Sequence, residues 1–419
     1  MELPKVALVE HRFDPQKIED IPAEVRSQLR TLRLQDRTKP GDTVAVTAGS
    51  RGVSNIDIIT RTIIDELKRA GTRPFIFTSM GSHGGATAEG QIKVLEAYGI
   101  TESQMGCPIL STMEVDYLGD AEDGFPIYVD RDAMGADHIV VVNRIKPHTK
   151  FDGPIESGLM KMMAIGMGNQ TGASYYHQAA VRLTFQRILD TVGREILKKC
   201  PVLCGVGIVE NGCDQTCLIK ALLPEEIPKA EEGLLIIAKE RMARLPFHNI
   251  DVLVIDEIGK NISGTGMDIN VTGRNRDILG DYTTSPRVGR IFVRDLTDET
   301  EGNALGMGLA DFTTTRVVEK MDRRKTYINC LTAISPEKGA IPLYFDTDRE
   351  ALEACLTSIG DRSPQDVRLV HIKNTLLLSR ISVSQAFEGE IAANDHLKRL
   401  KEWDSMALDN RGNIISPFD

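Results

Sequence analysis

Features that would direct this 419-residue chain to a membrane or to nucleic acid are missing from its sequence. No run of about 18 apolar residues occurs, so we expect no transmembrane helix. The first residues lack a basic segment followed by an apolar one, so we expect no secretory signal and a cytoplasmic protein. The net charge of −10 makes nucleic acid and anionic membrane surfaces poor partners.

Cysteine is scarce and odd in number, which argues against a disulfide framework. The seven cysteines fit the reduced thiols of a cytosolic protein. Cys200, Cys204, Cys213 and Cys217 are close enough in sequence to raise a zinc or iron–sulfur cluster, but the usual CxxC pairs are absent. Buried free cysteine is a common core residue, and we expect core thiols here.

The sequence also lacks a Walker A motif, and no G-x-G-x-x-G follows a strand pattern. These absences argue against ordinary nucleoside-triphosphate binding and against a Rossmann NAD site. What the first 250 residues do contain is an alternation of short β-rich runs and longer helical patterns, typical of a mostly parallel sheet covered on both faces. The predicted strands are Val6–Glu10, Thr43–Thr47, Pro74–Thr78, His138–Val142 and Val202–Val209, and the predicted helices are Ile56–Arg69, Ala88–Tyr98, Ala179–Lys199 and Glu225–Leu245.

A second alternating region follows Pro246, with predicted strands at Asp251–Asp256, Arg290–Val293, Tyr327–Cys330, Pro342–Tyr344 and Arg368–His371. We therefore predict an α/β fold of two domains with mostly parallel sheets, residues 1–247 and 248–404, and an active site in the cleft between them. Residues 405–419 are predicted to be a tail that returns to pack on the first domain.

The turn Gly49–Gly52 joins a predicted strand to a predicted helix. Its backbone N–H groups, together with Ser50, Arg51 and Gly52, form a candidate phosphate cradle, because ligands bind at the carboxyl ends of such strands. The alternative is an ordinary turn with Ser54 or Asn55 as the helix N-cap.

Two histidines follow other strands of the same predicted sheet. His83 is flanked by glycines, and His148 follows Lys146-Pro147. Imidazole titrates near neutrality, so such a pair could serve as acid and base on opposite faces of one carbon. The alternative is two ordinary core or surface histidines.

Lys161 stands among apolar residues, where partial desolvation would make its amine more nucleophilic. The alternative is a lysine whose stem packs along a helix while its charge reaches water. His177 lies 16 residues further on, near the start of a long helical pattern.

Together these segments resemble the nickel-dependent lactate racemase family, which comprises 2-hydroxy-acid racemases and epimerases. The segments that carry the resemblance are, in order, Ser82-His83-Gly84, Lys146-Pro147-His148, Gly158-Leu159-Met160-Lys161 and His177. The spacing of Lys161 and His177 also fits the family.

The resemblance implies a nickel-pincer nucleotide of the nickel pyridinium-3,5-bisthiocarboxylic acid mononucleotide type, which other enzymes must synthesise. It implies that Lys161 tethers this cofactor, that His177 is the protein ligand to nickel, and that Arg51 lies near the cofactor. His83 and His148 would be the acid–base pair. Racemisation would proceed by hydride shuttling between C2 of the substrate and the cofactor.

One departure from the family concerns the substrate. The family commonly has an aspartate where this chain has Ala48, and the second-domain substrate residues are not clearly recoverable. Arg274 or Arg276 could meet a substrate carboxylate, and the substrate could be lactate-like or a sugar acid. Two other functions remain open: a sugar-acid dehydratase or dehydrogenase that uses another cofactor, and a non-catalytic ligand-binding sensor.

Overall fold

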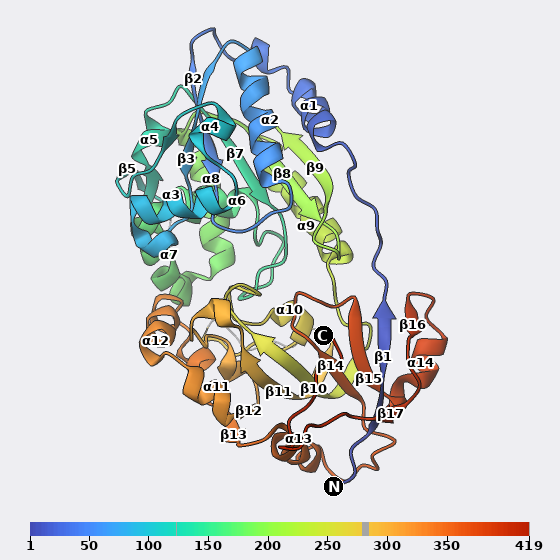
Figure 1. Ribbon diagram of the computed structural model, residues 1–419. Coiled ribbons are helices and arrows are strands. Elements are labelled where there is room, and N and C mark those ends of the chain that lie inside the picture. Colours follow the sequence, from blue (N-terminus) through green and yellow to red (C-terminus); the bar gives the residue numbers. More distant parts are fainter. Residues whose placement is uncertain (123, 279–284, 419) are drawn as a thin grey trace. The chain divides into compact units, whose positions relative to one another are not determined.

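A computed structural model describes residues 1–122, 124–278 and 285–418 and divides the chain into two compact units (Figure 1). Unit 2 is Asp14–Met242, and unit 1 combines Met1–Phe13 with Ala243–Asp419. Both units are α/β, as predicted. Within the described ranges, no helix is both long and apolar enough to cross a membrane.

The sheet of unit 2 has the strand order β4-β3-β2-β7-β8-β9. Every neighbouring pair is parallel except β8 with β9, which confirms the mostly parallel sheet. The strands are β2 (Thr43–Ala48), β3 (Arg73–Thr78), β4 (Ile109–Leu110), β7 (His138–Arg144), β8 (Val202–Glu210) and β9 (Thr216–Leu222). A separate antiparallel pair consists of β5 (Val115–Asp120) and β6 (Pro126–Asp130).

Helices cover both faces of this sheet. Alternate residues of the strands, such as Val44 and Val46 of β2, pack with Ile59 and Ile63 of α2 in one core. The helices of unit 2 are α1 (Ile21–Thr31), α2 (Ile56–Arg69), α3 (Ala88–Ala97), α4 (Glu102–Met105), α5 (Arg131–Met134), α6 (Leu159–Lys161), α7 (Asn169–Leu183), α8 (Phe185–Lys199) and α9 (Ile227–Arg241).

Two glycines in β8 let other segments lie close on the opposite face. A Cβ at Gly205 would come within 2.7 Å of the Leu159 side chain, and one at Gly207 within 2.7 Å of Ile145. Because these positions carry no side chain, the short helix α6 and Ile145, the residue after β7, lie close against β8. That contact fixes the height of Lys161, which ends α6, above the strands.

The prediction of one helix over Ala179–Lys199 is wrong. Helix α7 ends at Leu183, Thr184 has a φ of 69°, and α8 begins at Phe185. A β-branched residue rarely adopts positive φ, so tertiary packing must hold Thr184 there. The buried side chain of Phe185 supplies such packing.

Unit 1 contains a larger, mixed sheet with the order β13-β12-β11-β10-β14-β15-β1-β16, to which β17 adds by pairing with β1. Strands β10 to β14 of this sheet pair in parallel, and β15, β1, β16 and β17 pair antiparallel. The strands are β1 (Lys5–His11), β10 (Asn249–Ile258), β11 (Arg287–Leu296), β12 (Phe312–Thr314), β13 (Leu343–Phe345), β14 (Leu369–Ile372), β15 (Arg380–Ser384), β16 (Leu397–Arg399) and β17 (Asp404–Ser405). The helices are α10 (Ile269–Thr272), α11 (Thr315–Lys320), α12 (Arg323–Thr332), α13 (Asp348–Thr357) and α14 (Glu388–Ala392).

Both ends of the chain differ from the predicted domain division. The first strand pairs antiparallel with β15, so residues 1–13 lie in unit 1 although the prediction placed them in the first domain (Figure 1). The tail packs on the same unit, since Ile414 N–H donates to Asp348 at 2.9 Å and the Ser416 hydroxyl donates to Asp256 at 2.7 Å. The predicted boundary at 247/248 lies five residues after the observed end of unit 2 at Met242.

The predicted strand Tyr327–Cys330 is also wrong, because these residues lie within α12. The Asp322 side chain caps that helix by accepting the Lys325 N–H at 3.0 Å. A short apolar run fits a helix as well as a strand, and here the cap decides the outcome.

Candidate active site

The turns after β2 and β3 meet at Ser50 and His83. The Ser50 hydroxyl is hydrogen-bonded to Nδ1 of His83, and the Tyr98 hydroxyl donates to the Ser50 carbonyl at 2.9 Å. Gly81, in the His83 turn, has a φ of 59° and donates its N–H to Gly166 at 3.3 Å. The glycine therefore lets the turn bend towards the segment that follows Lys161.

Arg51, next to Ser50, places a cation at this edge of the sheet. Its side chain keeps contact with solvent, but the surrounding protein lowers the pKa of its guanidinium, and the nearby Arg144 charge adds to this effect. Arg144 itself forms an ion pair with Glu210. Arg51 stays charged at neutral pH and suits an anionic ligand.

Lys161 ends α6 and is followed by a turn of π-helix, Met162–Gly166, in which Met167 N–H reaches back to Met162 at 2.9 Å. Such π-helical turns are frequent at functional sites. The lysine is half-buried, and its Nζ lies 3.5 Å from the Ser157 hydroxyl. Removal of water by burial, together with the charges of Arg51 and Lys146, lowers the pKa of Lys161 to about 7.

His148 lies in the loop after β7. Its Nδ1 accepts the Lys150 N–H at 3.1 Å, and its own N–H donates to Glu156 at 2.5 Å. Its ring lies 4.4 Å from that of Phe151. With Nδ1 accepting a hydrogen bond, the neutral imidazole carries its proton on Nε2.

His177, on α7, has the opposite arrangement of its two nitrogens. Its Nδ1 donates to the Ala173 carbonyl at 2.6 Å, which leaves Nε2 with a lone pair. Burial lowers the pKa of His177 to about 4, and the charges of Lys150 and Lys161 contribute. The ring is therefore neutral at pH 7 and able to coordinate a metal.

Phe185, the first residue of α8, joins the two histidines. Its ring contacts that of His177 edge-on at 5.0 Å, and His148 lies 6.4 Å away on the same ring. Phe151 stacks on it at 5.3 Å. Sequence reasoning missed Phe185, because a lone aromatic at the start of a helix resembles any core residue.

The charges around Lys161 are mainly positive. Arg51 and Lys146 both act to lower its pKa, while Glu156 raises it less strongly. Lys150 lies 6.0 Å from the Phe185 ring and acts on His177. This arrangement favours ligands that carry phosphate or carboxylate groups.

These residues fit a nickel-pincer nucleotide. The cations suit the phosphate of a mononucleotide, and a lysine with a pKa near 7 is available for acylation. The Nδ1–H of His177 donates to a backbone carbonyl, the arrangement that orients a metal-binding histidine. In the parts of the chain that the structure describes, no cluster of three or more His, Cys, Asp or Glu residues could hold a metal by itself, so metal binding here would depend on the cofactor's own donors.

The four cysteines between residues 200 and 217, which were expected to be core thiols, differ in their exposure. Cys200 and Cys204 are buried, whereas Cys213 is exposed. Burial raises the pKa of Cys204 to about 12, as expected for a core thiol in β8.

The two predicted substrate arginines lie in unit 1. Arg274 donates to Asp311 at 2.5 Å and to the carbonyls of Val288 and Gly289 at 2.9 Å each. These bonds favour a structural role for Arg274. Arg276 is about half exposed and lies 3.6 Å from Asp311, so its role as a substrate residue stays a prediction.

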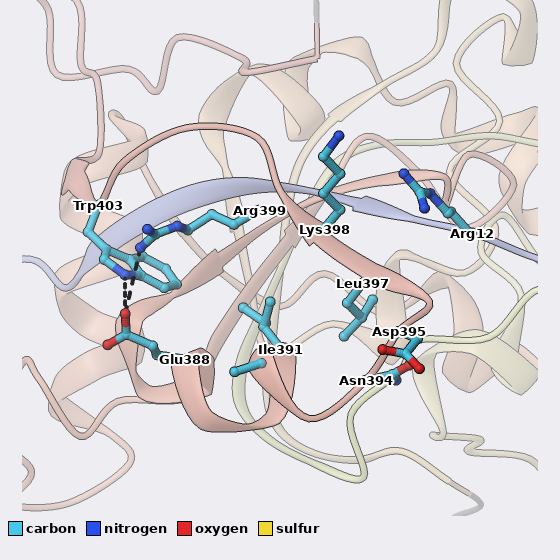
Figure 2. Close-up of a pocket in the computed structure, with 10 residues that line it drawn as sticks. Arg12, Glu388, Ile391, Asn394, Asp395, Leu397, Lys398, Arg399 and Trp403 are labelled. Atoms are coloured by element: carbon cyan, nitrogen blue, oxygen red, sulfur yellow. Dashed lines mark hydrogen bonds and ion pairs between the residues drawn. The ribbon is translucent and has the colours of Figure 1, made fainter.

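A pocket of about 480 Å³ lies in unit 1, beside β1, β16 and α14 (Figure 2). Trp403 is fixed at its edge by a bond from Nε1 to Glu388 at 3.1 Å and by the Arg399 guanidinium 5.3 Å from its ring. None of the predicted site residues lines this pocket, so it is separate from the chemistry considered above.

Residues 6–185 match the family model of the lactate racemase N-terminal domain. The matched stretch contains the segments around His83, His148, Lys161 and His177, and it ends at Phe185.

Two solved structures resemble the chain. The lactate racemase apoprotein from Thermoanaerobacterium thermosaccharolyticum has 12% sequence identity and a TM-score of 0.50, over 83% of this chain and 91% of that chain. A protein from Thermotoga maritima has 16% identity and a TM-score of 0.44, over 58% of this chain, which spans 65% of that protein's length. No curated protein matches the chain. The likeness to the lactate racemase apoprotein confirms the α/β fold class.

Proposed function

We propose that this protein is a racemase or epimerase that inverts C2 of a 2-hydroxy acid with a nickel-pincer nucleotide. The observation that carries the proposal is the pairing of Lys161 with His177. The lysine has a pKa of about 7, and the histidine is held neutral with Nε2 available. A dehydratase, a dehydrogenase with another cofactor or a ligand sensor gives no reason for this pair.

Lys161 supplies the attachment point. Because its pKa is about 7, the Lys161 amine is neutral in about half of the molecules at pH 7, whereas an ordinary lysine is almost fully protonated. When bound, the cofactor would supply the acceptor for the C2 hydride. Arg51 would hold an anionic group of the cofactor or substrate near this attachment point.

His83 and His148 divide the proton transfers. At His83 the Ser50 hydroxyl can accept from Nδ1–H, which gives Nε2 the lone pair of a general base. At His148 the Lys150 N–H points at Nδ1, so Nε2–H is the donor to a substrate oxygen. Proton removal at one histidine and donation at the other supports inversion at a carbon between two faces of a site. The partners required are a small 2-hydroxy acid, lactate-like or a sugar acid, and the enzymes that make the cofactor.

The test is the intact mass and nickel content of protein prepared in its native host. We expect a mass excess on the peptide containing Lys161 and about one nickel per chain. An unmodified Lys161 and no nickel in that preparation would contradict the proposal.

His83→Ala and His148→Ala should each lower racemisation of the accepted acid by about 10²–10⁴-fold and keep the mass excess. His396→Ala, on an exposed residue of unit 1, is the control. Full turnover in both active-site variants would remove the assigned acid–base pair.

A further inference from the structure

Helix α9 reaches both segments that carry the proposed chemistry. Glu231 and Lys239 lie eight residues apart on α9, which places them about 12 Å apart along its axis. Neither side chain is among the residues that the lactate racemase resemblance identifies. Each nevertheless acts, directly or through one neighbour, on the main chain beside Lys161 or His148.

Glu231 holds the start of the turn that ends in Lys161. Its Oε2 accepts the Met160 N–H at 2.9 Å. A Cβ at Gly158 would lie 2.1 Å from Oε1, so the carboxyl group is pressed against the beginning of α6. Burial raises the pKa of Glu231 to about 7, against the opposing effect of the Met160 and Leu159 amides.

Lys239 acts on the His148 loop through Glu156. Its Nζ lies 2.5 Å from Glu156 Oε1 and 2.7 Å from Asp152. The Glu156 side chain is 1% exposed, and it accepts the N–H groups of His148 at 2.5 Å and Gly153 at 3.3 Å. The charge on α9 therefore compensates the buried carboxylate that fixes the loop.

A buried carboxylate costs desolvation energy, and an apolar residue of similar size often gives a more stable fold. Here two such carboxylates both receive main-chain N–H groups, from Met160 and from His148. Main-chain bonds fix the path of a turn whatever its side chains are. Such an arrangement is expected where the position of a segment matters more than its stability.

We propose that α9 is a positioning element. In it, Glu231 fixes the position of the Lys161 segment, and Lys239, through its ion pair with Glu156, fixes the position of the His148 loop. The inference rests on the proposed function, because that function gives Lys161 and His148 their roles. Hydrogen exchange on cofactor-free protein tests the positioning without any assumption about the reaction.

The first test compares Glu231→Leu with Glu231→Gln by hydrogen exchange resolved to single amides. Glu231→Leu removes the acceptor, so exchange of the Met160 amide should rise about tenfold or more. Glu231→Gln retains a carbonyl oxygen in place of the carboxylate and should restore most of the protection. Glu240→Leu, at an exposed position of the same helix, should leave Met160 unchanged.

The second test removes the cation. Lys239→Met leaves Glu156 buried without compensation, and exchange of the His148 amide should rise about tenfold. Adding Glu156→Gln removes the charge but keeps an acceptor, so the double variant should return to within about threefold of the parent. Lys229→Met, at an 88% exposed lysine of α9, is the control.

Unchanged exchange at Met160 and His148, or failure of Glu231→Gln and of the double variant to rescue, would overturn the positioning role. In cofactor-loaded enzyme, Glu231→Leu should lower kcat about tenfold or more with KM within about twofold, since misplacement affects the reacting geometry. If the amides respond as expected while no cofactor or racemisation is found, the proposed function fails and the positioning stands. If racemisation is found and the amides do not respond, only the positioning role fails.

Discussion

Replacing Lys161 by methionine should stabilise the cofactor-free protein. The side chain is half-buried, and burial together with two neighbouring cations lowers its pKa to about 7. At pH 7 the Lys161 amine is therefore only about half protonated in the folded protein, whereas it is almost completely protonated in the unfolded chain. Methionine has a similar length and no charge to desolvate.

The magnitude follows from proton linkage. The fall of the pKa from 10.5 to about 7 corresponds to about 4 kcal/mol at pH 7, when one pKa unit is worth about 1.4 kcal/mol. Lys161 keeps part of its solvent contact, so about half of this is expected, and Lys161→Met should raise the free energy of unfolding by about 2 kcal/mol. Because the unfolded chain binds the extra proton between pH 7 and 10.5, the gain should shrink as the pH rises through that window.

Urea unfolding at pH 7 and at pH 10 measures both effects. Far-UV circular dichroism follows the whole chain, while fluorescence of Trp403, the single tryptophan, reports unit 1 and serves as an internal reference. Lys93→Met, on the exposed side of α3, is the matched control. A Lys161→Met variant that is less stable than the parent at pH 7, or equally stabilised at both pH values, would refute the reasoning.

Two further substitutions test one contact inside each unit. Gly158→Ala would set a Cβ 2.1 Å from Glu231 and should lower the free energy of unfolding in urea by about 2 kcal/mol. Gly233→Ala, whose Cβ would have nothing within 4 Å, should be neutral or stabilising by up to about 1 kcal/mol. Equal effects of the two substitutions would contradict the contact between Gly158 and Glu231. In unit 1, burial alone would raise the pKa of Asp256, but His371 and Arg294 lower it to about 2. The stabilisation that ionised Asp256 provides is present above pH 3.8 and is lost as the pH falls towards 2. Asp256→Asn should therefore lower the free energy of unfolding by about 3 kcal/mol at pH 7, measured by Trp403 fluorescence, and should flatten the acid transition. Asp361→Asn, at an exposed position, is the control.

The local part of the site could be predicted from the sequence. The strand–turn–helix pattern around Ser50, the glycines around His83 and the apolar run around Lys161 each occupy a few consecutive residues. Period and turn chemistry determine such segments, so α2 was predicted with the bounds it has, Ile56–Arg69. The carboxyl ends of parallel strands then bring the turns to one edge of the sheet.

The parts that were not predicted depend on contacts between distant segments. Glu231 is 71 residues from Met160, whose amide it receives, and a glutamate on an amphipathic helix gives no sign of burial. The break at Thr184 depends on packing of Phe185, since neither residue is a helix breaker by itself. The first strand resembles any α/β opening strand, and its pairing with β15 joins residues about 375 positions apart, an interaction that no local pattern encodes.

Lys161 and Glu231 together make the neutral range the costliest one for folding of unit 2. The pKa of Glu231 is raised to about 7, so its contribution to stability is present below pH 4.5 and is lost as the pH rises to 7. The pKa of Lys161 is lowered to about 7, so its contribution is present above pH 10.5 and is lost as the pH falls to 7. The two effects have opposite slopes and meet near pH 7. A core selected for stability alone would contain neither group, whereas acylation of Lys161 would remove its charge and with it that part of the cost.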